Sequence, residues 1–188
     1  MGRLLNPANL LTLSRVLLTP LVAGSILRKE HSLALALLAV AGASDAVDGV
    51  LARRFGWSTR LGAYFDPIAD KILLVASYIA LWAAGLIPWW LLMIVVGRDV
   101  LILVIAGAAL LWTKQRRFDP SVWGKLSTLV QILTGVIVIG NQAAPWAVLA
   151  SWADVLPTLA ATTTAWSGVH YAWRAAQLWG ETGGKKED

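Results

Sequence analysis

The residues of this chain best suited to chemistry are four aspartates within residues 44–71: Asp45, Asp48, Asp66 and Asp70. The first two are three positions apart and the last two are four apart, so each pair would share one face of a helix. Four carboxylates this close together would repel one another at neutral pH unless cations lay among them. The pattern therefore predicts a site for divalent ions that prefer oxygen ligands, Mg²⁺ or Mn²⁺.

Small residues beside the carboxylates leave room for a ligand. Gly49, Ala52 and Gly62 carry almost no side chain, so a bound group could approach the backbone closely. Arg53 could add a charge-assisted hydrogen bond to a phosphate oxygen. Pairing with neighbouring basic side chains at a wet interface would account for one or two aspartates, but not for all of them on converging faces. We therefore expect chemistry on a metal-bound diphosphate.

Most of the chain that must position these residues is apolar. Hydrophobic residues make up 57% of the 188 and charged residues only 14%, whereas a soluble domain carries about 25% charged residues. Apolar segments of about 20 residues, long enough to cross about 30 Å of hydrocarbon, lie at 8–27, 32–52, 61–84, 88–112, 122–140 and 146–179. The sequence predicts an all-α, polytopic membrane protein with six transmembrane helices, forming one integral-membrane domain over residues 1–188.

The distribution of basic residues predicts the topology. If the N-terminus lies inside, the outer loops contain only Arg28 and Lys29. The inner loops and tails then contain Arg3, Arg53, Arg54, Arg60, Lys114, Arg116, Arg117, Lys185 and Lys186. This asymmetry favours both termini inside, with the aspartates on the cytoplasmic side. It also accounts for the net charge of +5 without a nucleic-acid surface, and the absence of cysteine excludes thiolate metal sites.

This stretch resembles the signature of the CDP-alcohol phosphatidyltransferases at all eight positions and every spacing. In this chain the signature is Asp45-x2-Asp48-Gly49-x2-Ala52-Arg53-x8-Gly62-x3-Asp66-x3-Asp70. The resemblance extends over most of the chain, through Asn9, Thr12, Arg15, Pro20, Arg98, Gly124, Lys125, Thr128 and Gln131.

This resemblance implies transfer of a phosphatidyl group from CDP-diacylglycerol to an acceptor hydroxyl, with release of CMP. It implies two metal ions held by Asp45, Asp48, Asp66 and Asp70, with Asp70 also the general base. It implies a CDP pocket lined by Asp48, Gly49, Ala52, Arg53 and Gly62. A homodimer in the bacterial inner membrane, surrounded by lipid and with its active site facing the cytoplasm, is also implied.

The acceptor is predicted from departures from the family's patterns. Bacterial phosphatidylglycerophosphate synthases, which use glycerol 3-phosphate, usually carry Arg-Glu where this chain has Arg98-Asp99. They commonly have a second lysine where this chain has Ser127. A phosphate monoester carries nearly two charges and favours clustered cations, so the missing lysine favours a diester acceptor. Phosphatidylglycerol, the acceptor of the family's cardiolipin synthases, is therefore preferred, and glycerol 3-phosphate is the alternative.

Arg98 and Lys125 are the candidates for binding the acceptor phosphate. We expect Arg98 to pair poorly with Asp99, because adjacent helical residues point about 100° apart. Lys125 either contacts the acceptor or extends to lipid headgroups. Arg15 either contacts a lipid phosphate or supports the aspartate cluster. Three polar residues near the end of the last segment either anchor it at the membrane interface, which is preferred, or contact the acceptor: His170, Tyr171 and Arg174.

Two other functions are compatible with aspartates in a membrane protein. UbiA-like prenyltransferases also hold a metal diphosphate, but they typically have about nine spans, more than this chain can form at about 20 residues each. Their aspartate motifs also lack the Gly-x2-Ala-Arg continuation. A divalent-cation transporter would be expected to show inverted repeats and broken helices, and neither is evident in the sequence. The transferase is therefore preferred.

Overall fold

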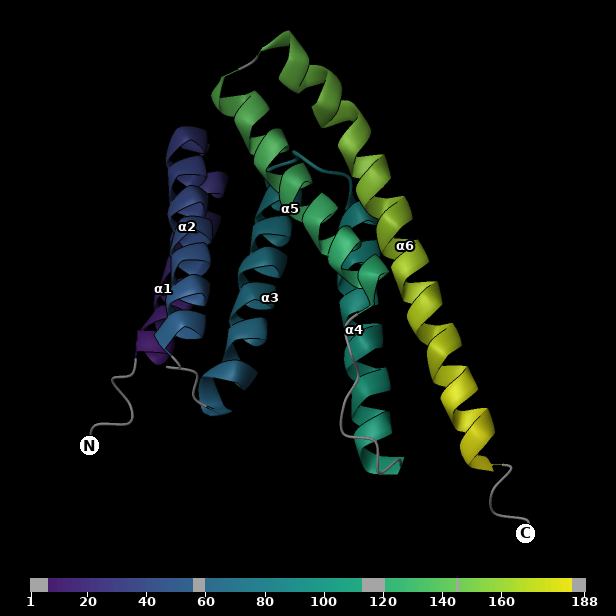
Figure 1. The fold of residues 1–188 in the computed structure, drawn as a ribbon. Coiled ribbons are helices and arrows are strands. Elements are labelled where there is room, and N and C mark those ends of the chain that lie inside the picture. Colours follow the sequence, from purple (N-terminus) through teal and green to yellow (C-terminus); the bar gives the residue numbers. More distant parts are fainter. Residues whose placement is uncertain (1–6, 56–59, 113–120, 145, 184–188) are drawn as a thin grey trace. The chain divides into compact units, whose positions relative to one another are not determined.

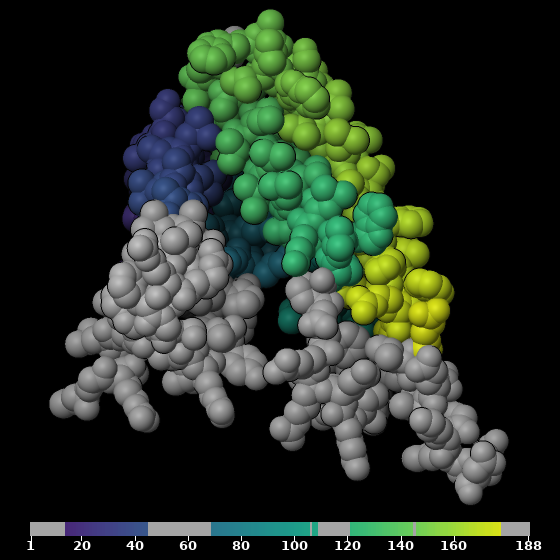
Figure 2. All heavy atoms as spheres, viewed as in Figure 1, coloured from purple at the N-terminus to yellow at the C-terminus, as the bar shows by residue number. Residues whose placement is uncertain are grey.

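The computed structural model describes the backbone of residues 7–55, 60–112, 121–144 and 146–183. Side chains are described for residues 14–44, 69–105, 107–108, 121–144 and 146–177, and these are the ones coloured in Figure 2. The secondary structure within these ranges consists of helices joined by short turns (Figure 1). The six helices are α1 (Pro7–Leu27), α2 (His31–Phe55), α3 (Arg60–Ala83), α4 (Trp89–Trp112), α5 (Val122–Ala143) and α6 (Ala147–Gly183).

The six helices confirm the all-α prediction, and their bounds lie close to those of the six apolar segments. The largest differences are at the ends of α2, α5 and α6, each of which continues about three or four residues beyond the predicted end. Among the described residues, α5 is the helix that is long and apolar enough by itself to cross a membrane. Six transmembrane spans therefore stay a prediction.

The chain divides into two compact units. The first contains residues 1–88 and 135–153, and the second contains residues 89–134 and 154–188, so α5 and α6 contribute to both. In the first unit α1 packs against both α2 and α3. Its core includes the buried side chains of Val22, Ile26, Ala34, Tyr78 and Leu81. That residues 1–188 form a single domain remains a prediction.

Short turns connect α1 to α2 and α3 to α4. At the end of α1, Glu30 N–H donates to the Ser25 carbonyl at 2.9 Å, and Lys29 has a left-handed backbone with φ 62°. At the end of α3, Leu86 N–H donates to the Leu81 carbonyl at 2.9 Å, and Gly85 has φ 73°. Both turns have the hydrogen-bond pattern of a Schellman motif, which satisfies the last carbonyl groups of a helix.

In the second unit, α5 and α6 bury polar side chains and expose apolar ones. Ser127, Gln131 and Thr164 are fully buried. The Gln131 amide donates to Thr164 Oγ1 at 2.8 Å, and the hydroxyls of Ser127 and Thr164 lie 3.2 Å apart. The exposed faces of the two helices are instead apolar, as shown by Leu129, Ile132, Leu133, Trp166 and Val169. This is the reverse of the pattern of a helix on the surface of a soluble protein, and it is typical of helices in hydrocarbon.

Candidate functional site

The four aspartates lie on two helices that both pack against α1. Asp45 and Asp48 are in α2, and Asp66 and Asp70 are in α3. The backbone is helical through both pairs, so each pair shares a helix face as predicted. Most of the predicted site has no described side chains. The residues concerned are Asp45, Asp48, Gly49, Ala52, Arg53, Gly62 and Asp66. Their roles stay predictions.

Asp70 forms an ion pair with an arginine of the first helix. Arg15 Nη1 donates to Asp70 Oδ1. The Arg15 side chain is only 5% exposed, whereas that of Asp70 is 51% exposed. The backbone carbonyl of Arg15 accepts a hydrogen bond from Thr19 Oγ1 at 2.8 Å, one turn further along α1. The structure thus shows Arg15 paired with Asp70, one member of the predicted aspartate cluster.

The exposure of Asp70 bears on whether a metal ion fits here. A half-exposed carboxylate can be reached by an ion from solvent, and four carboxylates form a set of oxygen donors that suits Mg²⁺ or Mn²⁺. Among the described residues no group of three or more potential ligands could hold an ion, since three of the four aspartate side chains lie outside them. The chemistry of the predicted donor set, four carboxylates, fits a divalent ion, and that the aspartates hold one stays a prediction.

Arg98, in α4 of the second unit, is buried and makes two hydrogen bonds. Its Nη1 donates to Asp99 Oδ1 at 2.8 Å and its Nη2 donates to Ser167 Oγ on α6 at 3.1 Å. The expectation that Arg98 would pair poorly with Asp99 was therefore wrong. Adjacent residues leave the helix in different directions, but the arginine side chain is long enough to curve back to the carboxylate. A buried guanidinium also strongly favours an available counter-charge.

The surroundings of Arg98 include an aromatic ring and a glycine. The ring of Tyr171 lies 5.8 Å from Arg98 Cζ, within the range of a cation–π interaction. A Cβ added at Gly124 would lie 3.1 Å from Arg98 Nη2 and 3.0 Å from the Tyr171 hydroxyl oxygen. Arg98 Nε is buried and has no hydrogen-bond partner among the described residues. Lys125, the other candidate for acceptor binding, follows Gly124, and its side chain is exposed.

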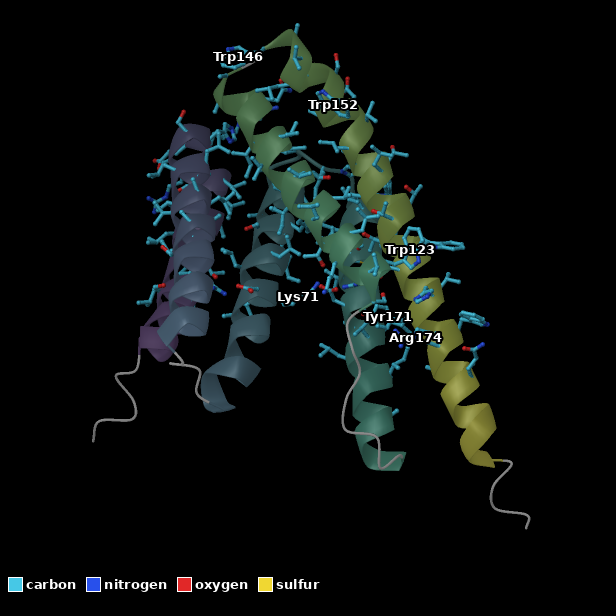
Figure 3. The ribbon with its side chains drawn as sticks, in the orientation of Figure 1. Lys71, Trp123, Trp146, Trp152, Tyr171 and Arg174 are labelled. Carbon is cyan, nitrogen blue, oxygen red and sulfur yellow. The ribbon has the colours of Figure 1, made fainter. Side chains whose placement is uncertain are left out.

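Tyr171 differs from the expectation that it anchors α6 at a membrane interface. It lies on α6 near Arg174 (Figure 3). It is 9% exposed, and its hydroxyl accepts a hydrogen bond from the Ser121 backbone N–H at 2.9 Å. Ser121 Oγ in turn accepts from Gly124 N–H at 3.1 Å, which caps the beginning of α5. Arg174, one helical turn beyond Tyr171, is exposed and fits the anchoring expectation better.

A signal for this contact was present in the sequence. The buried residues Ala160, Thr164, Ser167 and Tyr171 follow one another at intervals of four, three and four positions, the spacing of a single helix face. Small and polar residues at that spacing in an apolar helix indicate a face that packs against protein. Together they place Tyr171 on the buried side of α6.

The acidic site and Arg98 belong to different units of the chain: Asp70 and Arg15 to the first, and Arg98, Lys125 and Tyr171 to the second. The structure therefore brings together Asp70 with Arg15, and Arg98 with Asp99, Ser167 and Tyr171. That all of them serve one substrate complex is a proposal.

Comparison with known proteins extends these observations. The sequence profile of the CDP-alcohol phosphatidyltransferase family matches residues 5–167, a range that includes the aspartates, Arg98 and Lys125. A Mycobacterium tuberculosis (strain CDC 1551 / Oshkosh) protein named "Probable phosphatidylglycerophosphate synthase" is 34% identical over 93% of this chain and 83% of its own length. The human "Cardiolipin synthase (CMP-forming)" is 30% identical over 90% of this chain and 62% of its own length.

A third relative, from Drosophila melanogaster, is named "Probable cardiolipin synthase (CMP-forming)" and is 36% identical over 70% of this chain and 46% of its own length. The relatives thus divide between two names, phosphatidylglycerophosphate synthase and cardiolipin synthase, whereas the family profile covers most of the chain. The profile match confirms the family that the eight-residue signature predicted. The chain belongs to the CDP-alcohol phosphatidyltransferase family.

Proposed function

We propose that this CDP-alcohol phosphatidyltransferase is a cardiolipin synthase, which transfers the phosphatidyl group of CDP-diacylglycerol to a hydroxyl of phosphatidylglycerol and releases CMP. The observation that carries the reaction class is the family match over residues 5–167, which contains every position of the aspartate signature. The choice of acceptor depends on Arg98 and on the residues around it.

Asp70 is the general base in this proposal. The acceptor hydroxyl gives its proton to the Asp70 carboxylate while its oxygen forms a bond to the β-phosphorus of CDP-diacylglycerol. The bond from that phosphorus to the bridging oxygen breaks, and CMP leaves with the electron pair. Arg15 holds Asp70 by their ion pair, so the carboxylate keeps one orientation during turnover.

The four aspartates hold two divalent ions, Mg²⁺ or Mn²⁺, which when bound neutralise the diphosphate and stabilise CMP as the leaving group. The CDP moiety contacts residues at the helix ends that carry the signature, where glycine and alanine permit close approach. These are Asp48, Gly49, Ala52, Arg53 and Gly62.

Arg98 and Lys125 bind the acceptor phosphate. Arg98 is already paired with Asp99, so the local charge of the two side chains together is close to zero. A phosphodiester carries one negative charge and a phosphate monoester nearly two at neutral pH. The Arg98–Asp99 pair therefore favours the singly charged phosphodiester of phosphatidylglycerol over glycerol 3-phosphate.

Glycerol 3-phosphate is the second candidate acceptor. It is favoured by the mycobacterial relative named phosphatidylglycerophosphate synthase, which matches 93% of this chain at 34% identity. If that relative indicates the acceptor, Lys125 supplies the additional positive charge that a monoester requires.

The protein is placed in the bacterial inner membrane with six transmembrane helices, both termini inside, and the aspartates facing the cytoplasm. Polar side chains buried between α5 and α6, with apolar residues on the exposed faces, support a hydrocarbon environment for these helices. The basic residues of the inner loops support the orientation. A single domain over residues 1–188 and a homodimer complete the proposal.

The test is to supply detergent-solubilised protein with CDP-diacylglycerol, Mn²⁺ and one acceptor at a time, and to measure CMP and the lipid product by mass spectrometry. Cardiolipin formed with phosphatidylglycerol, and no new lipid with glycerol 3-phosphate, is the expected result. Phosphatidylglycerophosphate as the product would assign the second acceptor instead. If Mn²⁺ binds but no alcohol yields CMP, the result favours the alternative of a divalent-cation transporter.

A further inference from the structure

We propose that Tyr171 is a positioning residue that fixes the Arg98 guanidinium and the beginning of α5 in the arrangement used to bind the acceptor phosphate. This inference rests on the proposed role of Arg98 in acceptor binding. It adds a function for Tyr171, Gly124 and Ser121, none of which contacts the reacting atoms in the proposal above.

Tyr171 touches two elements at once. Its hydroxyl accepts a hydrogen bond from the Ser121 backbone N–H immediately before α5, at 2.9 Å, and its ring lies 5.8 Å from Arg98 Cζ on α4. A single, 9% exposed side chain from α6 therefore connects α4 with the start of α5. Lys125, the other acceptor candidate, lies in the first turn of that same helix, so Tyr171 also fixes the segment that carries it.

The glycine at position 124 is needed for this arrangement. A Cβ there would lie 3.0 Å from the Tyr171 hydroxyl oxygen, 3.2 Å from Tyr171 Cε2 and 3.1 Å from Arg98 Nη2, so both side chains would have to move. Gly168 also faces Arg98, yet a Cβ there would make ordinary contacts, 3.7 Å from Arg98 Cγ. At Gly97 a Cβ would meet nothing within 4 Å. Close packing is thus concentrated at the point where Tyr171 and Arg98 meet α5.

Arg98 is held on several sides but keeps capacity for a ligand. Asp99, Ser167 and the Tyr171 ring contact its guanidinium, whereas its buried Nε has no hydrogen-bond partner among the described residues. A buried N–H without a partner is unfavourable, and a phosphate oxygen would satisfy it. An arginine whose rotamer is fixed before binding loses less conformational freedom when the acceptor arrives. Loss of Tyr171 contacts should therefore weaken acceptor binding.

The experiment measures the Michaelis constants for the acceptor and for CDP-diacylglycerol separately, with the acceptor that supports turnover. Tyr171→Leu, which removes both the ring and the hydroxyl, should raise the acceptor Michaelis constant about tenfold, and Tyr171→Phe, which keeps the ring, about threefold. Gly124→Ala should act in the same direction. In all three variants the Michaelis constant for CDP-diacylglycerol should stay within about twofold of the unmodified value.

Two variants serve as matched controls. Gly97→Ala makes the same chemical change as Gly124→Ala, next to Arg98 but in open space. Trp173→Phe alters an exposed aromatic residue on the same helix as Tyr171. Neither should change the acceptor Michaelis constant. Thermal unfolding of each variant in detergent identifies any loss that is due to misfolding.

A double-mutant comparison tests whether Tyr171 acts through Arg98. In an Arg98→Ala background, Tyr171→Leu should raise the acceptor Michaelis constant much less than tenfold, because only the contact of Tyr171 with the beginning of α5 is then lost. The same tenfold rise in that background would overturn the inference. So would a Tyr171→Leu variant whose melting temperature and kcat fall while its Michaelis constant for the acceptor stays unchanged. If Arg98→Ala alone leaves acceptor use unchanged, the proposed role of Arg98 fails. If Arg98→Ala impairs acceptor use but Tyr171→Phe and Gly124→Ala do not, only the positioning role fails.

Discussion

Arg15 of α1 donates a hydrogen bond to Asp70 of α3, 55 residues further along the chain. The arginine is almost fully buried and the aspartate is half-exposed, so the pair joins a buried side chain to one that solvent can reach. The guanidinium also offsets part of the repulsion among the predicted cluster of carboxylates. The first helix thus contributes a charge to a site whose signature lies entirely in α2 and α3 and the residues between them.

Arg15→Ala should lower kcat about 10- to 100-fold, the usual effect of removing a partner that orients a ligand of a metal site. Arg15→Lys keeps the charge but not the planar donor geometry, so it should restore only part of the rate. Steady-state assays of CMP release measure both. The control is Arg28→Ala, which replaces an exposed arginine just after α1 and should leave kcat unchanged. An unaltered kcat in Arg15→Ala would show that Asp70 needs no such support.

Asp70→Asn tests the general base directly. The amide is nearly isosteric with the carboxylate but cannot accept the acceptor's proton, so turnover should fall by about 10²- to 10⁴-fold. Binding of CDP-diacylglycerol, measured by equilibrium titration in the presence of Mn²⁺, should be largely retained. Asp154→Asn makes the same change at an exposed residue of α6 and should have no effect. Normal turnover in Asp70→Asn would remove Asp70 from the base role.

Asp45→Asn and Asp66→Asn test the proposed metal ligands. Each replaces a charged donor by a neutral one, so each should raise the Mn²⁺ concentration needed for half-maximal binding by more than about tenfold. Calorimetric titration of the protein with Mn²⁺ alone provides a measurement that does not depend on turnover. A titration curve identical to that of the unmodified protein would exclude that aspartate as a ligand.

The approximate bounds of the helices were predictable, because the length of each apolar segment matches the thickness of the hydrocarbon core of a membrane. The predicted segment 88–112 corresponds to α4, Trp89–Trp112, since uninterrupted apolar residues define both of its ends. The predicted end of the second segment, at residue 52, was less accurate because polar residues continue the helix to Phe55. Hydropathy marks where a chain enters hydrocarbon, and a helix can extend beyond that point.

The contacts around the site could be predicted only where they follow from local spacing. Helix periodicity placed each aspartate pair on one face. For Arg15 the sequence left two alternatives, a lipid phosphate or the aspartate cluster, because its contact with Asp70 depends on how α1 packs against α3. The rule that adjacent residues diverge gave a wrong expectation for Arg98 and Asp99, since it describes Cβ directions rather than the reach of a long side chain. Tyr171 was likewise misplaced, because an aromatic residue near a helix end suits either an interface or a packed face.

Thr164→Val tests the polar contact between α5 and α6. Valine keeps the shape of threonine but removes the oxygen that accepts a hydrogen bond from Gln131 at 2.8 Å and lies 3.2 Å from the Ser127 hydroxyl. Hydrogen bonds between membrane helices contribute about 0.6 kcal/mol on average and up to about 1.7 kcal/mol. A loss in that range is expected in reversible unfolding measured in mixed detergent micelles. Thr162→Val, at an exposed site where the hydroxyl bonds to the Leu159 carbonyl of its own helix, should change stability less.

For the turns after α1 and α3, we predict that substitutions change the stability of the protein in opposite directions. Both have a residue in the left-handed region, Lys29 with φ 62° and Gly85 with φ 73°, and both have the same two hydrogen bonds closing the helix. A side chain in this region costs roughly 1–2 kcal/mol relative to the right-handed one, and glycine avoids that cost. The turn after α1 therefore contains a local strain that the turn after α3 lacks.

Gly85→Ala should destabilise the protein by about 1 kcal/mol through backbone strain alone, because the added Cβ would meet nothing within 4 Å. Lys29→Gly should stabilise it by less, a few tenths of a kcal/mol up to about 1 kcal/mol, since the greater freedom of glycine in the unfolded chain offsets part of the relief. Both changes are measured by the same detergent unfolding assay, with Gly97→Ala as a helical control expected to stabilise. If Gly85→Ala is neutral, the left-handed geometry of that turn is not required, and the sign expected for Lys29→Gly loses its basis as well.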